Sequence, residues 1–330
     1  MKIINPTPYV MERSVLLDRG GRESLLAIVK GTFRFGPGVT EVAEEQVPIT
    51  QADEYYDEPQ NSSIALATDL LPPRPTTGVT LSGCAVARKG PVEKMPVGIR
   101  LGNLVQKAWV FGDRIGYHNI SHPAPFEKMP LTWENAFGGV DMTPEKQKHH
   151  AGHDDNPVGR GFIASHSKID PATVRLPNIE NPDHLLRSKG DKPPAIGFGP
   201  VAPFWVARSR YGGTYDDAWV RERAPLLPDD FDERFLQAAP AQLTADSYLE
   251  GGEPVEILGM TEEGRIQFSL PDARPTLGIR LARRGIRTKP PLESVHIDTE
   301  ARTVTLTWKS LLDVQGQVEE LKSVEARLLG

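Results

Sequence analysis

The chain has 330 residues, of which 38% are hydrophobic and 25% are charged, and its formal net charge is −6. This length is enough for one large or two modest hydrophobic cores, and the composition excludes intrinsic disorder. The acidic balance provides no general attraction to nucleic acid or to an anionic membrane. The 30 prolines disfavour long helices and favour short strands, bends and ordered loops.

The cellular compartment is indicated by the cysteine count and by the apolar runs. Cys84 is the single cysteine, which excludes an intramolecular disulfide framework, and its apolar surroundings predict a buried structural thiol. The first residues lack the apolar region of a signal peptide, and no run of about 18 apolar residues occurs. We therefore expect a cytoplasmic bacterial protein.

The N-terminal region, residues 1–117, is predicted to be a series of strands. Residues 24–35 are rich in β-branched and aromatic side chains and end at a Gly-Pro-Gly turn signal. Residues 77–87 and 95–112 contain further short apolar runs of the same kind. Between them, the proline-rich segment 71–75 predicts a stiff, extended connector.

Two hairpins are predicted in the C-terminal region, residues 246–330. Residues 255–260 and 265–270 flank a four-residue loop, and residues 295–298 and 303–308 flank another. The alternation of apolar and polar residues in the second hairpin predicts one buried face and one solvated face.

The middle of the chain, residues 118–245, differs from both ends. It contains 15 of the 30 prolines and seven of the eight histidines. We expect a helix over residues 230–239, with Asp230 and Glu233 at capping-box spacing, and a shorter helical turn over 216–223. The sequence thus predicts a mainly β protein, β-sandwich-like or built of composite antiparallel sheets. A long irregular central insertion and one or two short helices complete what we expect to be one composite domain.

A histidine group is the most obvious candidate for a metal site. His149 and His153 are four residues apart, close to Asp154, and would share a face if the segment were helical. Gly152 and the Asn-Pro pair at 156–157 argue against a helix, so a polar loop is favoured. A metal-dependent hydrolase using His149, His153 and Asp154 stays open as the alternative function.

Other catalytic motifs receive less support. Residues 159–164 (GRGFIA) and 197–202 (GFGPVA) superficially match a dinucleotide fingerprint, but neither has the required preceding strand and following helix. The sequence has no Gly-x-Ser-x-Gly elbow. We therefore expect no catalytic residue, no cofactor and no small-molecule substrate.

A basic stretch runs through residues 274–289. Its basic residues, which partly alternate with apolar residues, are Arg274, Arg280, Arg283, Arg284, Arg287 and Lys289. A strand with a solvated face is the simpler interpretation, and a docking patch for an acidic protein surface is the alternative.

The strongest signal for binding is a set of aromatic residues interleaved with Gly, Asn and Arg in the central region. Such residues combine tight backbone turns with large contact groups, and Trp and Arg dominate binding hot spots. A loop whose tryptophans are simply buried is the competing interpretation. The predicted partner-binding residues are Trp133, Asn135, Phe137, Asn156, Arg160, Phe162, Trp205, Arg208, Tyr215 and Trp219.

These residues lie within several multi-residue motifs: 133–139 (WENAFGG), 156–162 (NPVGRGF), 176–180 (LPNIE), 197–203 (GFGPVAP), 213–216 (GTYD) and 228–231 (PDDF). In this order they resemble a bacterial family catalogued as domain of unknown function twenty-one sixty-nine, over residues 20–310. The resemblance implies an adaptor or chaperone of type VI secretion. Such a protein would bind and stabilise a PAAR-containing effector and help to load it onto the VgrG spike, without nucleic acid or membrane as a partner. The family brings no catalytic residues with it.

Overall fold

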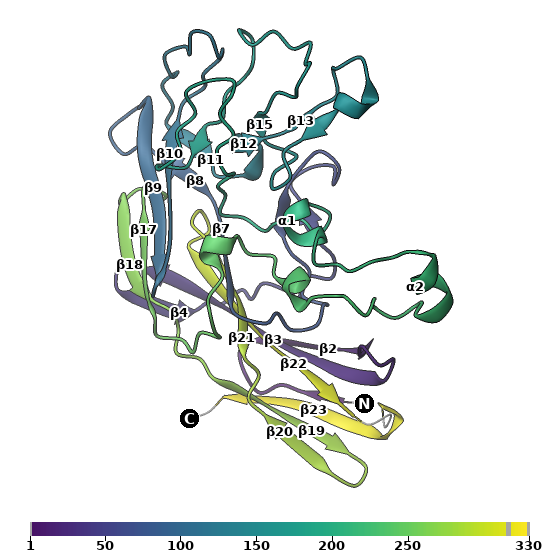
Figure 1. Cartoon of the computed structure of the whole chain (residues 1–330). Helices are drawn as coiled ribbons and strands as arrows, with labels where there is room; N and C mark the ends of the chain where they lie inside the picture. Colours follow the sequence, from purple (N-terminus) through teal and green to yellow (C-terminus); the bar gives the residue numbers. More distant parts are fainter. Residues whose placement is uncertain (1, 315–317, 329–330) are drawn as a thin grey trace.

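The computed structural model describes residues 2–314 and 318–328, and it is mostly β (Figure 1). The predicted mainly β fold with short helices is confirmed, because strands form 39% of the structure and helical residues 8%. Within the described residues, no helix is both long and apolar enough to cross a membrane.

Three large sheets contain most of the strands. The six-stranded sheet has the order β2-β3-β22-β21-β7, with β4 paired to β3; the five-stranded sheet has the order β16-β10-β9-β17-β18; the four-stranded sheet has the order β1-β23-β19-β20. The strands of the first are β2 (Val10–Leu17), β3 (Glu23–Gly36), β4 (Val39–Val42), β7 (Gly78–Ser82), β21 (Leu292–Asp298) and β22 (Thr303–Asp313). Those of the second are β9 (Lys94–Leu101), β10 (Leu104–Phe111), β16 (Ile179–Glu180), β17 (Pro254–Leu258) and β18 (Arg265–Ser269). Those of the third are β1 (Lys2–Ile4), β19 (Pro275–Leu281), β20 (Gly285–Thr288) and β23 (Leu321–Leu328).

The two ends of the chain are interleaved in these sheets. Strand β3 pairs with β22 along eleven positions, and β9 pairs with β17. One hydrophobic cluster joins side chains of all three sheets, including Val29, Ile99, Ile257, Leu277 and Leu306. The N-terminal and C-terminal regions therefore share one core.

Both predicted hairpins are present. Leu258 of β17 faces Arg265 of β18, and Asp298 of β21 faces Thr303 of β22. The expectation of a solvated face on the second hairpin is wrong, because Thr305, Thr307 and Lys309 are all less than 5% exposed. Residues 47–71, between β4 and β7, cover this face of the sheet, as hydrogen bonds from Val47 to Thr32 and from Lys309 to Leu71 show.

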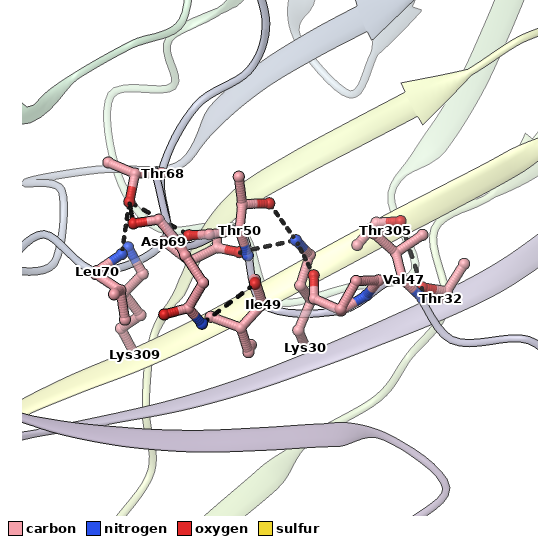
Figure 2. A network of polar contacts seen from close by, with 12 residues as sticks. Lys30, Thr32, Val47, Ile49, Thr50, Thr68, Asp69, Leu70, Thr305 and Lys309 are labelled. Carbon is pink, nitrogen blue, oxygen red and sulfur yellow. Dashed lines mark hydrogen bonds and ion pairs between the residues drawn. The ribbon is translucent and has the colours of Figure 1, made fainter. Parts of the chain in front are cut away.

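Polar pairing explains how this second face is buried (Figure 2). The Lys30 ammonium group donates hydrogen bonds to Asp69 at 2.7 Å, to the Thr50 hydroxyl at 3.1 Å and to the Pro48 carbonyl at 2.9 Å. Lys309 lies 2.9 Å from the carboxylate of Glu293. Because each buried cation meets an anion, polar side chains at alternate positions can be enclosed.

The central region and the N-terminal segments that it contacts consist of loops and very short paired strands. The pairs are β5 (Glu54–Tyr55) with β6 (Ile64–Leu66), β8 (Cys84–Val86) with β11 (Lys128–Pro130), β12 (Phe137–Gly138) with β15 (Arg160–Gly161), and β13 (Val140–Asp141) with β14 (Ala151–Gly152). The helical segments are α1 (Val206–Ser209), α2 (Asp217–Glu222), η1 (Trp133–Asn135), η2 (Gln147–His149), η3 (Glu233–Leu236), η4 (Ala241–Leu243) and η5 (Val318–Glu320).

Of the two predicted helices, one is confirmed and one is wrong. Helix α2 occupies the expected turn, capped by the Asp216 carboxylate, which accepts a hydrogen bond from the Trp219 amide. Residues 230–239 contain only the 3-10 turn η3, which Asp232 caps. Asp230 cannot cap a helix there because its carboxylate accepts hydrogen bonds from the amide and hydroxyl of Thr214.

Candidate functional site

Backbone pairing brings together the two glycine-rich motifs of the central region, residues 133–139 and 156–162. Strand β12 lies parallel to β15, with Phe137 opposite Arg160 and Gly138 opposite Gly161. Gly138 has a φ of 152°, and a Cβ atom at this position would lie 2.1 Å from the carbonyl oxygen of Asn156. Glycine is therefore required for the two motifs to approach this closely.

Asn156 joins the two motifs from the inside. Its side chain is 0% exposed, and its amide group donates hydrogen bonds to the carbonyl oxygens of Trp133 at 2.8 Å and Phe137 at 3.0 Å. The Trp133 carbonyl also accepts from the Ala136 amide, so Asn156 adds a second donor there and supplies the donor for the Phe137 carbonyl. Asn156 thereby fixes the path of the loop beneath β12.

Arg160 connects the motifs to a third segment. Its guanidinium donates to the Glu134 carbonyl at 2.8 Å and to the side-chain oxygen of Asn178 at 3.0 Å. Burial lowers the pKa of Arg160. Asn178 in turn donates to the carbonyl of Phe111 at the end of β10, which anchors the motifs to the five-stranded sheet.

Two tryptophans form a separate small core under the site. Trp133 and Trp205 pack edge to face with ring centroids 5.5 Å apart. The indole N–H of Trp133 donates to the carbonyls of Gly199 and Pro200, both at 3.1 Å. The 197–203 motif therefore packs over the ring of Trp133. The ring leaves no room for a side chain at Gly197.

Arg208 is buried on α1 and holds neighbouring loops. It donates to the carbonyls of Val201 at 2.7 Å and Phe235 at 3.0 Å. Burial, followed by repulsion from Arg74, lowers the pKa of Arg208 to about 10. Its role in this structure is to satisfy carbonyl groups inside the fold.

The ten predicted partner-binding residues thus fall into two groups. The side chains of Trp133, Asn135, Phe137, Asn156, Trp205 and Arg208 are buried. Arg160, Phe162, Tyr215 and Trp219 are at least partly exposed. The buried group shapes the site from within, so only the second group can contact a partner directly in this conformation.

An open groove of about 430 Å³ lies where the two motifs meet. Gly138, Gly139, Gly159 and Gly161 contribute backbone to its lining, and Arg160 and Phe162 contribute side chains. Further lining comes from residues that the sequence did not indicate, including Gln60, Asn61, Val140 and Arg175. No local pattern marks these four residues, since Gln60 and Asn61 lie about 80 residues before the motifs that they face.

The groove presents a particular chemistry. Its floor is glycine backbone whose carbonyl groups at Gly138, Gly139 and Gly161 accept hydrogen bonds from within the protein, and Arg175 is exposed at the rim. A floor without side chains lets a partner segment approach closely, and an arginine at the rim can bind a carboxylate.

Tyr215 and Trp219 lie apart from the groove, on the arm that projects with α2 (Figure 1). Their rings pack edge to face at 4.8 Å, and the Trp219 N–H donates to the Leu226 carbonyl at 2.8 Å. Tyr215 is 56% exposed. The structure therefore separates the exposed predicted residues into two surfaces.

The histidine cluster is not assembled as a metal site. Residues 147–149 form the 3-10 turn η2, so the four-residue spacing does not place His149 and His153 on one helical face. The His149 ring packs against His166, whereas His153 packs against Phe137, and burial lowers the pKa of His153. Across residues 2–314 and 318–328, no group of three or more His, Cys, Asp or Glu side chains is arranged to hold a metal ion.

Cys84 is half-buried, which is less than the full burial expected for it. It lines a cavity of about 490 Å³ together with Tyr56, Asp298 and Glu300. Burial, followed by the negative charge of Glu300, raises the pKa of the Cys84 thiol to about 11. A thiol with so high a pKa is a poor nucleophile at neutral pH.

These features define a mostly β protein with a groove lined by residues of the 133–139 and 156–162 motifs. The chain belongs to the bacterial family described as "Uncharacterized protein conserved in bacteria (DUF2169)", whose model matches residues 20–309. No curated protein and no solved structure matches the chain.

Proposed function

We propose that the chain is a cytoplasmic adaptor or chaperone of bacterial type VI secretion. It would bind a PAAR-containing effector, stabilise it and help to load it onto the VgrG spike. The family membership supports this proposal, because the resemblance of the motifs implies this role.

The observation that carries the proposal is the use that the structure makes of those motifs. Their buried residues hold glycine backbone in a fixed, open groove, with hydrogen bonds from Asn156 and Arg160 setting its shape. A preorganised surface loses little conformational entropy on binding a polypeptide. This supports a protein partner, since a fixed, open groove with an exposed arginine and an exposed valine at its rim fits a polypeptide segment.

Co-expression with a PAAR-containing effector encoded next to this chain provides the test. The expected result is a larger soluble fraction of the effector and co-purification of the two proteins. No gain in solubility together with no co-purification would contradict the proposal.

Variants at the rim assign binding to the groove. Arg175→Glu and Val140→Asp alter exposed groove residues without removing a buried contact. We expect each to weaken capture of the effector by about tenfold, with an unchanged melting temperature. Arg187→Glu is the matched control, because Arg187 is also exposed but lies outside the groove lining. Equal loss in the Arg187 variant would place binding elsewhere.

A further inference from the structure

A second surface stands out on the four-stranded sheet, away from the groove. The hairpin of β19 and β20 projects at the end of the molecule opposite the glycine-rich motifs (Figure 1). Strand β20 is the last strand of its sheet, paired with β19 on one side only. In the described part of the chain, no other strand covers its outer edge.

The pairing pattern shows which backbone groups are available on this edge. The amide of Leu281 donates to the carbonyl of Arg284, and Ile286 lies opposite Ile279. Hydrogen-bonded positions alternate along an antiparallel pair, so residues 284, 286 and 288 bond to β19. Gly285 and Arg287 therefore point their N–H and C=O groups outward, where an added strand could pair with them.

The same hairpin carries a concentration of positive charge. Arg280, Arg283, Arg284, Arg287 and Lys289 are all exposed. Among the described residues, none of these five side chains forms a hydrogen bond or an ion pair. Five unneutralised cations on one hairpin contrast with the net charge of −6 for the whole chain.

A groove of about 460 Å³ lies beside this edge, on the outer face of the sheet. Gly278 forms part of its floor, because the missing side chain leaves a depression between β20 and β23. Arg287 and Lys289 line one side, and Glu325 and Arg327 line the other. Glu325 is already paired with Arg327 at 2.8 Å, so the free charge in the groove is that of Arg287 and Lys289.

We propose that β20 is a docking edge for an extended, acidic segment of a partner protein. The segment would add a strand to the sheet through the outward groups of Gly285 and Arg287. Its alternate acidic side chains would reach Arg287 and Lys289 over the groove, where guanidinium binds carboxylate with two parallel hydrogen bonds. This surface is additional to the groove of the proposed function and does not depend on it.

Charge selects this occupant over a second copy of the chain. Antiparallel pairing of β20 with another β20 would bring the arginines of residues 283–287 opposite one another. Like charges in facing positions destabilise a strand pair. Exposed cations also protect an edge strand against self-association, and the acidic partner is the case in which the same charges favour pairing.

Fluorescence anisotropy with the full chain tests the proposal. The probe is a labelled peptide of about ten residues that alternates Glu and Val, and a Lys-Val peptide is the charge control. The expected result is saturable binding of the Glu-Val peptide only, weakened at high salt. A Glu-Val peptide N-methylated at alternate residues should bind about tenfold more weakly, because it cannot pair along its edge.

Matched variants identify the surface. Arg287→Glu with Lys289→Glu should reduce affinity for the Glu-Val peptide at least about tenfold. Lys146→Glu with Lys148→Glu makes the same change in net charge at two other exposed lysines and should leave affinity within about twofold. Circular dichroism verifies that both variants keep the fold.

Several results would overturn the proposal. These are no binding, equal losses in the two double variants, equal binding of the N-methylated peptide, or a dimer in sedimentation that the Arg287 and Lys289 changes abolish. Tighter binding of single-stranded DNA or of anionic vesicles through the same two residues would assign the surface to those ligands instead. Since none of these changes touches the groove at Arg160, failure here leaves the effector capture experiment unaffected.

Discussion

Replacing Asn156 with Asp is the most direct test of how the candidate site is held together. The change keeps the size of the side chain but converts its two donor hydrogens into an acceptor. Asn156 is fully buried and donates to the carbonyl oxygens of Trp133 and Phe137. The variant therefore leaves the buried Phe137 carbonyl without its donor and places a carboxylate beside both carbonyls, while the Trp133 carbonyl keeps its hydrogen bond from the Ala136 amide.

The magnitude follows from the Phe137 carbonyl that loses its donor. A buried polar group left unsatisfied costs about 1–3 kcal/mol, and the buried carboxylate adds to this, so Asn156→Asp should destabilise the chain by at least about 1–3 kcal/mol near neutral pH. The pKa of the new carboxyl should lie above its ordinary value, because burial without donors disfavours the charge. Protonation at low pH restores one donor, so the difference from the parent protein should shrink as pH falls.

Urea denaturation of parent and variant at several pH values measures this difference. Asn103→Asp is the control, since Asn103 is exposed in the turn between β9 and β10 and the same change there should cost less than about 0.5 kcal/mol. A cost below about 1 kcal/mol at Asn156, or a cost independent of pH, would refute the reasoning.

Two further predictions concern titrating groups. The pKa of Cys84 is raised from 9.0 to about 11, so iodoacetamide should label it about 100-fold more slowly in the native than in the unfolded chain near neutral pH. Glu300→Gln should increase the native labelling rate. Equal native and unfolded rates would contradict this. His296 lies between the Thr80 hydroxyl at 2.9 Å and the Ser82 hydroxyl at 3.3 Å, and burial lowers its pKa from 6.5 to about 4. The unfolded chain therefore takes up the proton first, so stability is full above pH 6.5 and falls as pH drops toward about 4, by up to about 3 kcal/mol. Urea titrations should show this loss reduced in His296→Asn but unchanged in the exposed control His122→Asn; parallel losses in both would argue against it.

The strands were predictable from the sequence because local composition determines them. Residues 24–35 are dense in β-branched and aromatic side chains, and they form most of β3. The hairpin loops follow from short polar turns between alternating segments. Such signals lie within a few residues of each other, so no tertiary information is needed to interpret them.

The burial of polar faces was not predictable for the opposite reason. Thr305, Thr307 and Lys309 alternate with apolar residues, as solvated residues of a surface strand do. Their burial depends on the chain between β4 and β7, and the neighbouring Lys30 pairs with Asp69, which lies 39 positions further along the chain. The helix expected over 230–239 failed similarly, because Thr214 takes the carboxylate of Asp230 from 16 residues away.

The candidate site was predictable in its motifs but not in the roles of their residues. The residues next to Trp133 in the sequence do not determine whether its ring is buried or exposed. What buries it is the 197–203 segment, which supplies Gly199 and Pro200 carbonyls to its indole N–H. Likewise, nothing near Gln60 or Asn61 indicates that both residues line the groove.

This division of roles constrains how binding can be assigned to residues. Changing Trp133, Asn156 or Arg208 removes hydrogen bonds to buried carbonyls, so stability and binding should fall together and the two effects cannot be separated. Changing Val140 or Arg175 alters groups at the surface of the groove, so binding can fall while stability stays. Selectivity among cargo proteins should therefore depend on rim residues such as Val140 and Arg175, while the 133–139 and 156–162 motifs form a common, rigid floor.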